Sequence, residues 1–453
     1  MSGLQVVVIG AGPAGVRAAE ALVAHGQRPV VVDEAPRWGG QIYRQPPPNF
    51  KRAKRLLYGF ETGRAEGVHG AMAGIVERID YRPDTLVWNA REGELDLLHR
   101  GRSTTLPYRR LIIASGATDR VLPFPGWTLP GVYSLGAAQV ALKAQGCAIG
   151  SRVVFAGTGP LLYLVAYQYA KAGATVAAVL DSARLGDKLA ALPALLRQPA
   201  VLAKGLYYRA WLQAHGVAVH EGAAPLQALG SQRVEGLRWR DGPREQQLAC
   251  DAIGFGHALR SETQLADLLG CSHAFEPLQR AHLPQRDAAG RSSVASVYLA
   301  GDGAGIMGAD AAEWAGERAA LALLEDAGVT VDGTRAHVLE QRLARVATFR
   351  RGLERAFPFP VDWAANVPDD LLICRCEEIS AGELRAAVRD TGATELNRLK
   401  ALTRVGMGRC QGRTCGVAAA EILAHASGLP IDAVGRLRGQ APVKPIPFSA
   451  GAA

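Results

Sequence analysis

Apolar residues fall into short continuous runs that alternate with longer amphipathic stretches along most of the chain. Residues 6–9, 30–32, 111–114 and 297–300 form four such runs, and a short uninterrupted run is typical of a strand buried on both faces of a parallel sheet. Residues 16–25 follow the first run with apolar side chains at helical spacing. This alternation predicts an α/β protein with a parallel sheet.

A glycine turn joins the first apolar run to the first helix. Gly10 makes the tight turn, Gly12 lets the backbone approach a pyrophosphate, and Gly15 lets the helix pack closely on the strand. The helix that opens at Pro13 and Ala14 offers free N–H groups and the positive end of its dipole to phosphates. The turn therefore predicts a dinucleotide site.

Two acidic residues follow the second apolar run. Asp33 stands at the end of this strand, where a carboxylate can accept hydrogen bonds from both ribose hydroxyls of a dinucleotide. Glu34 is the reserve candidate for the same role. Strand, glycine turn, helix, second strand and acid occur in the required order, so the prediction does not depend on the glycines alone.

Two later segments favour FAD over NAD as the ligand of this first motif. One buried strand ends near Ala114 and Gly116, and another ends at Gly301 and Asp302 before a helix expected from about residue 311. Asp302 can bond a ribityl hydroxyl, and the helix N-terminus can face the flavin or its phosphates. The competing interpretation of Asp302 is a loop acid or a helix N-cap.

A second strand, glycine turn and helix begin at residue 152. Gly157 and Gly159 keep their places, but Leu162 occupies the third glycine position, where helix and strand should pack closest. Asp181 ends the next strand and disfavours a 2′-phosphate, so NADP is the least suitable ligand. Two interpretations stay open: a loosened site for a second nucleotide (NAD, FMN or ATP), or a structural domain without a bound hydride donor.

Four of the seven cysteines lie near the C-terminus as C-x-C and C-x4-C. Four thiolates suit a structural zinc ion or an iron–sulfur cluster, and C-x-C is short for zinc. Flanking glycines let backbone N–H groups approach cluster sulfurs, and flanking arginines can balance an anionic [2Fe–2S] centre. The predicted cluster ligands are Cys374, Cys376, Cys410 and Cys415, whereas Cys147, Cys250 and Cys271 are predicted to be small buried residues.

The predicted layout is nested, with one nucleotide domain inserted into the other. Residues 184–214 and 335–354 show helical patterns, and Ser380 and Glu383 form a capping box at the start of a small helical domain. The expected segments are a first flavin-domain part (1–125), the inserted domain (126–253), a second flavin-domain part (254–330), a helical linker (331–369), the cysteine domain (370–425) and a tail (426–453).

Composition adds few constraints. The net charge is +9 over 453 residues, and the basic residues do not form a run interleaved with aromatics, so no nucleic-acid partner is expected. No basic and apolar leader opens the sequence, and no run of 18 apolar residues indicates an integral membrane segment. The sequence identifies no catalytic acid or base.

The glycine motifs and the Gly301–Asp302 segment resemble those of two-dinucleotide-domain flavoproteins of the glutathione-reductase and thioredoxin-reductase type. The resemblance implies that the first motif binds FAD and that the loop with Gly40, Gln41 and Arg44 runs beside the flavin. Redox members of that class carry a cysteine pair near the flavin, and its absence here argues against a dithiol reductase. The cysteine domain resembles the bacterioferritin-associated-ferredoxin (BFD) type of [2Fe–2S] domain, with C-x4-C in place of C-x-x-C.

The combination resembles the large FAD and [2Fe–2S] (alpha or A) subunits of bacterial multisubunit dye-linked amino-acid and opine dehydrogenases. This resemblance implies an oxidoreductase subunit for CH–NH donors. It also implies that a D-amino-acid-oxidase-like flavoprotein partner oxidises the amine, and that a small ferredoxin-like subunit can complete the assembly. Electrons would leave through this chain to a quinone or a dye, in the cytoplasm or at the inner-membrane surface. The alternative is a self-sufficient NADH-dependent FAD/[2Fe–2S] oxidoreductase, against which Leu162 counts.

Overall fold

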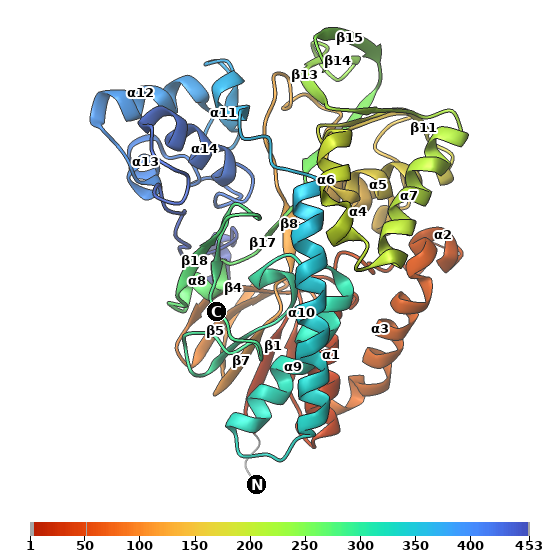
Figure 1. Ribbon diagram of the computed structural model, residues 1–453. Helices are drawn as coiled ribbons and strands as arrows, with labels where there is room; N and C mark the ends of the chain where they lie inside the picture. Colours follow the sequence, from red (N-terminus) through yellow and green to blue (C-terminus); the bar gives the residue numbers. More distant parts are fainter. Residues whose placement is uncertain (1–3, 51, 452–453) are drawn as a thin grey trace.

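The computed structural model describes residues 4–50 and 52–451, and Figure 1 shows two large lobes with a small helical body beside them. Each large lobe is built on a five-stranded sheet in which all paired strands run parallel. The predicted α/β class with two dinucleotide-type domains is therefore confirmed. The first sheet has the order β20-β7-β1-β2-β3, with bounds Val297–Leu299, Arg110–Ile113, Val6–Ile9, Val30–Val32 and Asp80–Arg82.

Strand β1 shows why its sequence is apolar without interruption. Successive side chains of a strand point to opposite faces of the sheet. Val6 and Val8 pack with helices α1, α3 and α9 on one face, whereas Val7 and Ile9 pack with the antiparallel strands β4, β5 and β6 on the other. These covering elements span Pro13–Ala24, Thr62–Ile75, Ala309–Asp326, Thr85–Arg91, Glu94–His99 and Arg102–Pro107.

The second sheet has the order β12-β11-β10-β16-β9. Helices α4, α5 and α7 share a core with one of its faces, and the antiparallel strands β13, β14 and β15 contribute to the core of the other. The sheet strands, in that order, are Ala218–Glu221, Thr175–Asp181, Arg152–Thr158, Ala252–His257 and Val132–Ser134. The covering elements are Leu135–Val140, Pro160–Lys171, Pro199–Ala214, Ala223–Leu229, Gly236–Asp241 and Arg244–Ala249.

The chain crosses between the two lobes in a short antiparallel ribbon. Strand β8 (Ala117–Asp119) leaves the first lobe, and β17 (Leu259–Ser261) returns beside it. Strand β16 of the second sheet spans the expected domain boundary at residue 253. After β17 the chain continues through α8, β18 and β19, at Gln264–Leu268, His273–Glu276 and Ala281–Pro284.

The C-terminal body is helical, as predicted, and also contains a strand pair that was not predicted. Ser380 accepts a hydrogen bond from the Glu383 N–H, and the Glu383 carboxylate accepts one from the Ser380 N–H, so the capping box is confirmed. Cys374 ends the first strand of the pair. The elements are β21 (Leu372–Cys374), β22 (Ile379–Ser380), α12 (Ala381–Thr391), α13 (Leu396–Thr403) and α14 (Gly416–Ser427).

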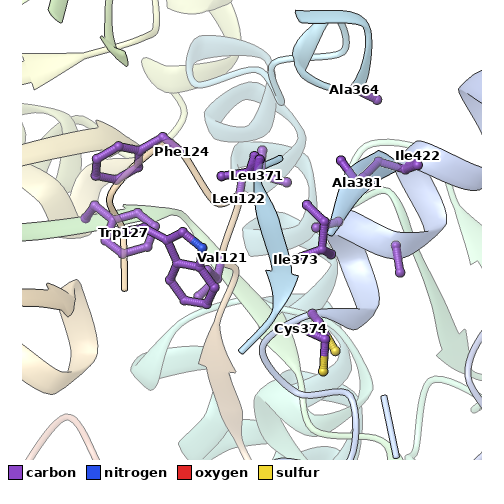
Figure 2. Close-up of a cluster of buried hydrophobic side chains, with 14 of the residues drawn as sticks. Val121, Leu122, Phe124, Trp127, Ala364, Leu371, Ile373, Cys374, Ala381 and Ile422 are labelled. Atoms are coloured by element: carbon purple, nitrogen blue, oxygen red, sulfur yellow. The ribbon is translucent and has the colours of Figure 1, made fainter. Parts of the chain in front are cut away.

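This body packs against the second lobe instead of standing apart from it. Helix α10 (Gly333–Ala356) packs against α6 (Leu185–Leu195), and the short helix α11 (Trp363–Asn366) follows it. Figure 2 shows Val121, Phe124 and Trp127 gathered with Leu371, Ile373 and Cys374 in one buried cluster. The Trp127 indole N–H also donates to the Leu372 carbonyl at 2.7 Å.

The three cysteines outside the predicted cluster set differ in exposure. Cys250 and Cys271 are buried, as predicted, but Cys147 is exposed, so that prediction is wrong for it. Cys147 follows the π-helical turn Ala141–Gln145 and a left-handed Gly146, which end the helical segment near the surface. None of the helices in the described ranges is long and apolar enough to cross a membrane.

Candidate flavin and cluster sites

The first glycine turn is sterically closed to side chains at two positions and open at the third. A Cβ on Gly10, whose φ is +100°, would lie 2.4 Å from the Ala114 carbonyl oxygen, and one on Gly15 would lie 1.7 Å from the Gly10 oxygen. A Cβ on Gly12 would meet only the Gly40 Cα, at 3.6 Å. The turn therefore leaves space in front of Gly12 at the N-terminus of α1, which suits a pyrophosphate.

Asp33 lies beside this turn. Its carboxylate accepts hydrogen bonds from the backbone N–H groups of Ala11, at 2.5 Å, and Ala35, at 2.7 Å. Burial raises the pKa of Asp33, while these two N–H groups oppose the rise. Each oxygen keeps one lone pair for a ribose hydroxyl. Glu34 instead forms an ion pair with Lys444 of the tail, with 52% of its side chain exposed.

The loop after the second strand lies against the glycine turn. Gly40 has a φ of +63°, and a Cβ there would lie 2.9 Å from the Gly12 Cα. Arg44 donates from its guanidinium to the Gln41 side-chain oxygen at 2.7 Å. The Arg44 Nε is buried and makes no hydrogen bond to any residue in the described part of the chain. An unpartnered buried donor in this loop fits an anionic ligand.

The two later flavin segments reach the same place. Gly301, with a φ of +70°, lies so close to α1 that a Cβ would be 2.9 Å from the Ala14 Cβ. Gly316 of α9 brings the two helices together, because a Cβ there would lie 1.9 Å from the Ala14 oxygen. Asp302 accepts from the Met307 and Gly308 N–H groups through one oxygen. It therefore shapes the loop before α9 and keeps its other oxygen available.

The same segments also adjoin the end of β7. A Cβ on Gly303 would lie 2.7 Å from the Ser115 Oγ and 3.4 Å from the Gly116 nitrogen. Gly10, Asp33, Gly40, Ala114 and Gly301 thus come together from three well-separated regions of the sequence. A glycine cradle, a free helix N-terminus and an acid with spare lone pairs fit the adenosine and pyrophosphate portions of FAD.

The second glycine turn is also closed at its first glycine, but a leucine occupies its third position. Gly157 has a φ of +129°, and a Cβ there would lie 1.8 Å from the Gly256 oxygen of β16. Gly159, with a φ of +106°, would place a Cβ 3.4 Å from the Ala258 Cβ. Leu162 is completely buried in the apolar core between α5 and its neighbours. The bulky residue is accommodated because that core uses it as a packing side chain.

Asp181 is fully occupied by protein donors. Its carboxylate accepts from Thr158 Oγ1 at 3.2 Å, Ala183 N at 3.0 Å, Tyr163 Oη at 2.7 Å and Lys188 Nζ at 2.7 Å. Two donors on each oxygen use all four lone pairs. Asp181 has no exposed surface.

Three of the four predicted cluster cysteines meet through their sulfur atoms. The Cys415 thiol hydrogen-bonds Cys374 and Cys410, and this contact lowers the pKa of Cys374 to about 6. The hydrogen bond with Cys415 also lowers the pKa of Cys410. The pKa of Cys415 itself is raised, mainly by its hydrogen bond with Cys374 and then by the one with Cys410. Cys376 is exposed at the edge of the group. Within residues 4–50 and 52–451, no three His, Cys, Asp or Glu side chains form a ligand set for a single metal ion.

Backbone groups surround these sulfurs. Cys374 accepts from the N–H groups of Gly406, Glu377 and Cys376, and each contact lowers its pKa. Cys410 likewise accepts from the Thr414 and Gly412 N–H groups. Three converging thiols, with Cys376 close by in sequence and N–H donors around two of them, fit a [2Fe–2S] cluster, which takes four thiolates.

The flanking arginines are mostly engaged elsewhere. The Arg375 guanidinium lies 5.6 Å from the centre of the Trp127 ring, Arg404 pairs with Glu377 at 2.8 Å, and Arg413 pairs with Glu262 at 2.6 Å.

A cation that sequence reasoning missed comes from the first lobe. Arg260 donates from one guanidinium nitrogen to the carbonyls of Gly412 and Arg413, at 3.3 and 3.1 Å. Burial lowers the pKa of Arg260, while Glu262, Cys415 and Cys410 oppose that change. No local motif marks Arg260, because it meets the cluster loop only through the fold.

Comparison with known proteins agrees with both sites. Residues 4–316 match the family described as pyridine nucleotide-disulphide oxidoreductase, and residues 372–425 match the BFD-like [2Fe-2S] binding domain. The chain is 36% identical to the A subunit of opine oxidase from Agrobacterium tumefaciens (strain Ach5), over 97% of this chain and 90% of that protein. It is 34% identical to hydrogen cyanide synthase subunit HcnB of Pseudomonas protegens, over 99% and 97%.

Among solved structures, L-proline dehydrogenase from P. horikoshii superposes with a TM-score of 0.74 at 18% identity, over 99% of this chain and 79% of that chain. Thioredoxin reductase of T. acidophilum gives a TM-score of 0.53 at 19% identity, over 71% of this chain and 98% of that chain. These two likenesses concern the fold. The predicted FAD and [2Fe–2S] cofactors are confirmed by the family matches.

Proposed function

Since the chain belongs to the pyridine nucleotide-disulphide oxidoreductase family, and within it to the FAD and [2Fe–2S] subunits that include the A subunit of opine oxidase, we propose that it is the electron-transferring subunit of a heteromeric amino-acid dehydrogenase. The donors we propose are amino acids or opines of the proline, hydroxyproline or opine type. When bound, FAD accepts two electrons together and releases them singly, and the cluster accepts one at a time.

One observation carries this proposal: the flavin site and the cysteine loop touch within one chain. Glu262 accepts a hydrogen bond from Ser115 Oγ through its carbonyl, at 2.7 Å, and pairs with Arg413 through its carboxylate, at 2.6 Å. Ser115 lies in the flavin segment, and Arg413 lies between two cluster cysteines. A single residue therefore links the two cofactor sites, as a relay protein requires.

We place the amine-binding pocket on a partner protein of the complex. That partner is a flavoprotein of the D-amino-acid-oxidase type, and a small ferredoxin-like subunit completes the assembly. The acceptor that receives electrons from the cluster is a quinone, or a dye in the assay. The opine oxidase and hydrogen cyanide synthase relatives are both named as subunits, which supports a multisubunit arrangement.

The rival function is a self-sufficient NADH oxidoreductase, and the second lobe supports it poorly. An NAD site of this type uses the acid after the second strand to accept the ribose hydroxyls. Asp181, the residue at that position, already receives four protein donors. We therefore propose that the second lobe has a structural role and binds no nicotinamide nucleotide.

The two functions differ in a test with purified chain carrying FAD and cluster. NADH should leave the flavin absorbance unchanged on the scale of turnover, and the chain alone should oxidise no amino acid or opine. Adding the partner flavoprotein should produce dye reduction that depends on amine. Rapid flavin bleaching by NADH would support the rival function, and amine oxidation by the chain alone would place the substrate pocket within it.

A further inference from the structure

We propose that residues 260–264, here called the clamp, fix the cluster loop (residues 410–415) on the flavin loop (residues 114–116). The Glu262–Arg413 ion pair, as a positioning contact, then sets how fast an electron passes between the two sites. This inference rests on the proposed relay function. It adds a device that positions one cofactor site relative to the other.

The backbone of the clamp is attached to the flavin loop. The Glu262 N–H donates to the Gly116 carbonyl at 3.0 Å, and its own carbonyl accepts from Ser115 Oγ at 2.7 Å. A Cβ on Gly303 would lie 3.5 Å from the same Glu262 carbonyl. The centre of the clamp therefore contacts two of the segments that form the flavin site.

The side chains of the clamp are directed to the cluster loop at alternate positions. Arg260 donates to the carbonyls of Gly412 and Arg413, Glu262 accepts from Arg413, and Gln264 donates to the Gln411 carbonyl at 2.7 Å. The clamp begins in β17 with Arg260 and ends at Gln264, the first residue of α8, because Thr263 has left the extended conformation. This change from strand to helix presents three polar side chains to one loop.

The central ion pair is largely shielded from water. The side chains of Glu262 and Arg413 are 13% and 14% exposed. Removing one charge from such a pair leaves the other buried without its partner, so the loop would move to rehydrate it. Arg413 lies between the ligands Cys410 and Cys415, and any movement of Arg413 therefore displaces cluster ligands relative to the flavin loop.

A second ion pair provides a matched control. Arg280 pairs with Glu421 of α14 at 2.7 Å, and Glu421 is 5% exposed. This pair also joins the first lobe to the C-terminal body, but neither residue lies in the flavin loop or the cluster loop. Glu421→Gln therefore removes a buried interdomain charge without touching the clamp, whereas Glu262→Gln removes the one that joins the two loops.

The test uses full-length chain carrying FAD and cluster, without partner or acceptor. Light with 5-deazaflavin and EDTA as electron donor reduces the flavin anaerobically. Transfer of one electron from the reduced flavin to each cluster is then measured by the loss of reduced-flavin absorbance and by the rise of the cluster's EPR signal. FAD, iron and labile sulfide are measured for each variant. Glu262→Gln should slow the transfer at least roughly tenfold, because a small displacement at a reacting centre is costly, and Glu421→Gln less than about twofold. Where Glu262→Gln loses its cluster, Glu262→Asp, with a shortened carboxylate, is compared instead.

The outcomes separate the two proposals. Unchanged transfer in Glu262→Gln, or an equal slowing in Glu421→Gln, would overturn the clamp while leaving the relay function intact. No transfer in the unmodified chain would overturn the relay function and the clamp together. Hydrogen exchange over residues 410–415 gives an independent readout, because it should rise in Glu262→Gln and stay unchanged in Glu421→Gln.

Discussion

At the scale of single residues, the cluster site depends on four thiols of unequal environment. Cys374 and Cys415 are buried, Cys410 is intermediate and Cys376 is exposed. The hydrogen bond with Cys415, and after it the backbone donors, lower the pKa of Cys374 and Cys410, which favours metal binding near neutral pH. We propose all four as cluster ligands, because three of the sulfur atoms converge and Cys376 completes the sequence pattern.

Single cysteine-to-serine substitutions test this ligand set. Cys374→Ser, Cys376→Ser, Cys410→Ser and Cys415→Ser should each lose most iron and labile sulfide, because a serine hydroxyl stays protonated where a thiolate is needed. Cys147→Ser, Cys250→Ser and Cys271→Ser should keep the full iron and sulfide content of a [2Fe–2S] cluster, because these cysteines lie outside the ligand set. Stoichiometric zinc without labile sulfide in the unmodified chain would contradict the cluster.

Arg260 carries a second residue-scale prediction. Its half-buried positive charge near Cys410 and Cys415 would stabilise the more negative, reduced cluster. Arg260→Met should therefore make the midpoint potential more negative, by roughly 59 mV for each tenfold change in a one-electron equilibrium. Redox titration with EPR detection measures this shift. Arg404→Met, which removes a guanidinium with 67% exposure, should change the potential far less, and an equal change would contradict the role of Arg260.

Sequence reasoning finds the residues that local geometry dictates. Gly10, Gly12 and Gly15 are recognisable because one turn needs each of them at fixed spacing. Arg260 and Glu262 are not recognisable in this way, because they acquire their contacts with the distant residues Gly412 and Arg413 only in the folded chain.

At the scale of secondary-structure elements, the carboxyl ends of β10 and β11 support the proposal that the second lobe has a structural role. Gly157 and Asp181 are paired across these strands in the register of a nucleotide site. Leu162 fills the helix–strand contact, and Tyr163, one residue further along α5, donates to Asp181. The acid therefore supports the fold at the position where a nucleotide-binding domain would hold a ribose.

Asp181→Asn tests this structural role. The amide cannot accept from all four donors, and Lys188 keeps only Glu221 as an acidic partner, at 2.8 Å. The free energy of unfolding in urea should fall by about 2–4 kcal/mol, as expected for a broken buried ion pair. The FAD content should stay unchanged because the first lobe is untouched. Glu34→Gln, at an ion pair with 52% exposure, should change stability by less than about 1 kcal/mol. Unaltered stability in Asp181→Asn would contradict the assignment.

Helices and strands with strong periodicity can be predicted from the sequence, whereas the pairing of very short strands cannot. The run of valines in β1 identifies a strand buried on both faces, and the capping box at Ser380 identifies the start of α12. The pairing of β21 with β22 involves only three and two residues, so no alternation develops that could mark it. Its turn is stabilised by the Cys374 sulfur, which accepts from the Cys376 and Glu377 N–H groups.

At the scale of the whole molecule, the C-terminal body is joined to both lobes. Its apolar residues continue the core of the second lobe, and its loops contact the first lobe through the clamp and the Arg280–Glu421 pair. In Figure 1 the body lies beside the two lobes and not at the end of an extended linker. The cluster loop is therefore held in one position relative to the flavin site by contacts on two sides.

Trp127 is the central side chain of the contact with the second lobe. It is 4% exposed, packs with Phe255, donates to the Leu372 carbonyl and lies under the Arg375 guanidinium. Trp127→Ala would remove this packing and leave the Leu372 carbonyl without its donor. The loss should weaken docking by about 3–5 kcal/mol, as for other buried aromatic truncations.

Limited proteolysis measures this docking, because a released body exposes the segment between α10 and β21. Cleavage within residues 357–371 should become markedly faster in Trp127→Ala, while FAD stays bound to the first lobe. Trp314→Ala is the control, since Trp314 lies in α9 and packs in a core cluster of the first lobe that contains no residue of the 357–371 segment or of the docked body. Equal cleavage rates in the two variants would show that the body is held by the first lobe alone. The clamp and the Arg280–Glu421 pair would then have to provide the whole docking energy, and the Trp127 cluster would serve only to cover the second sheet.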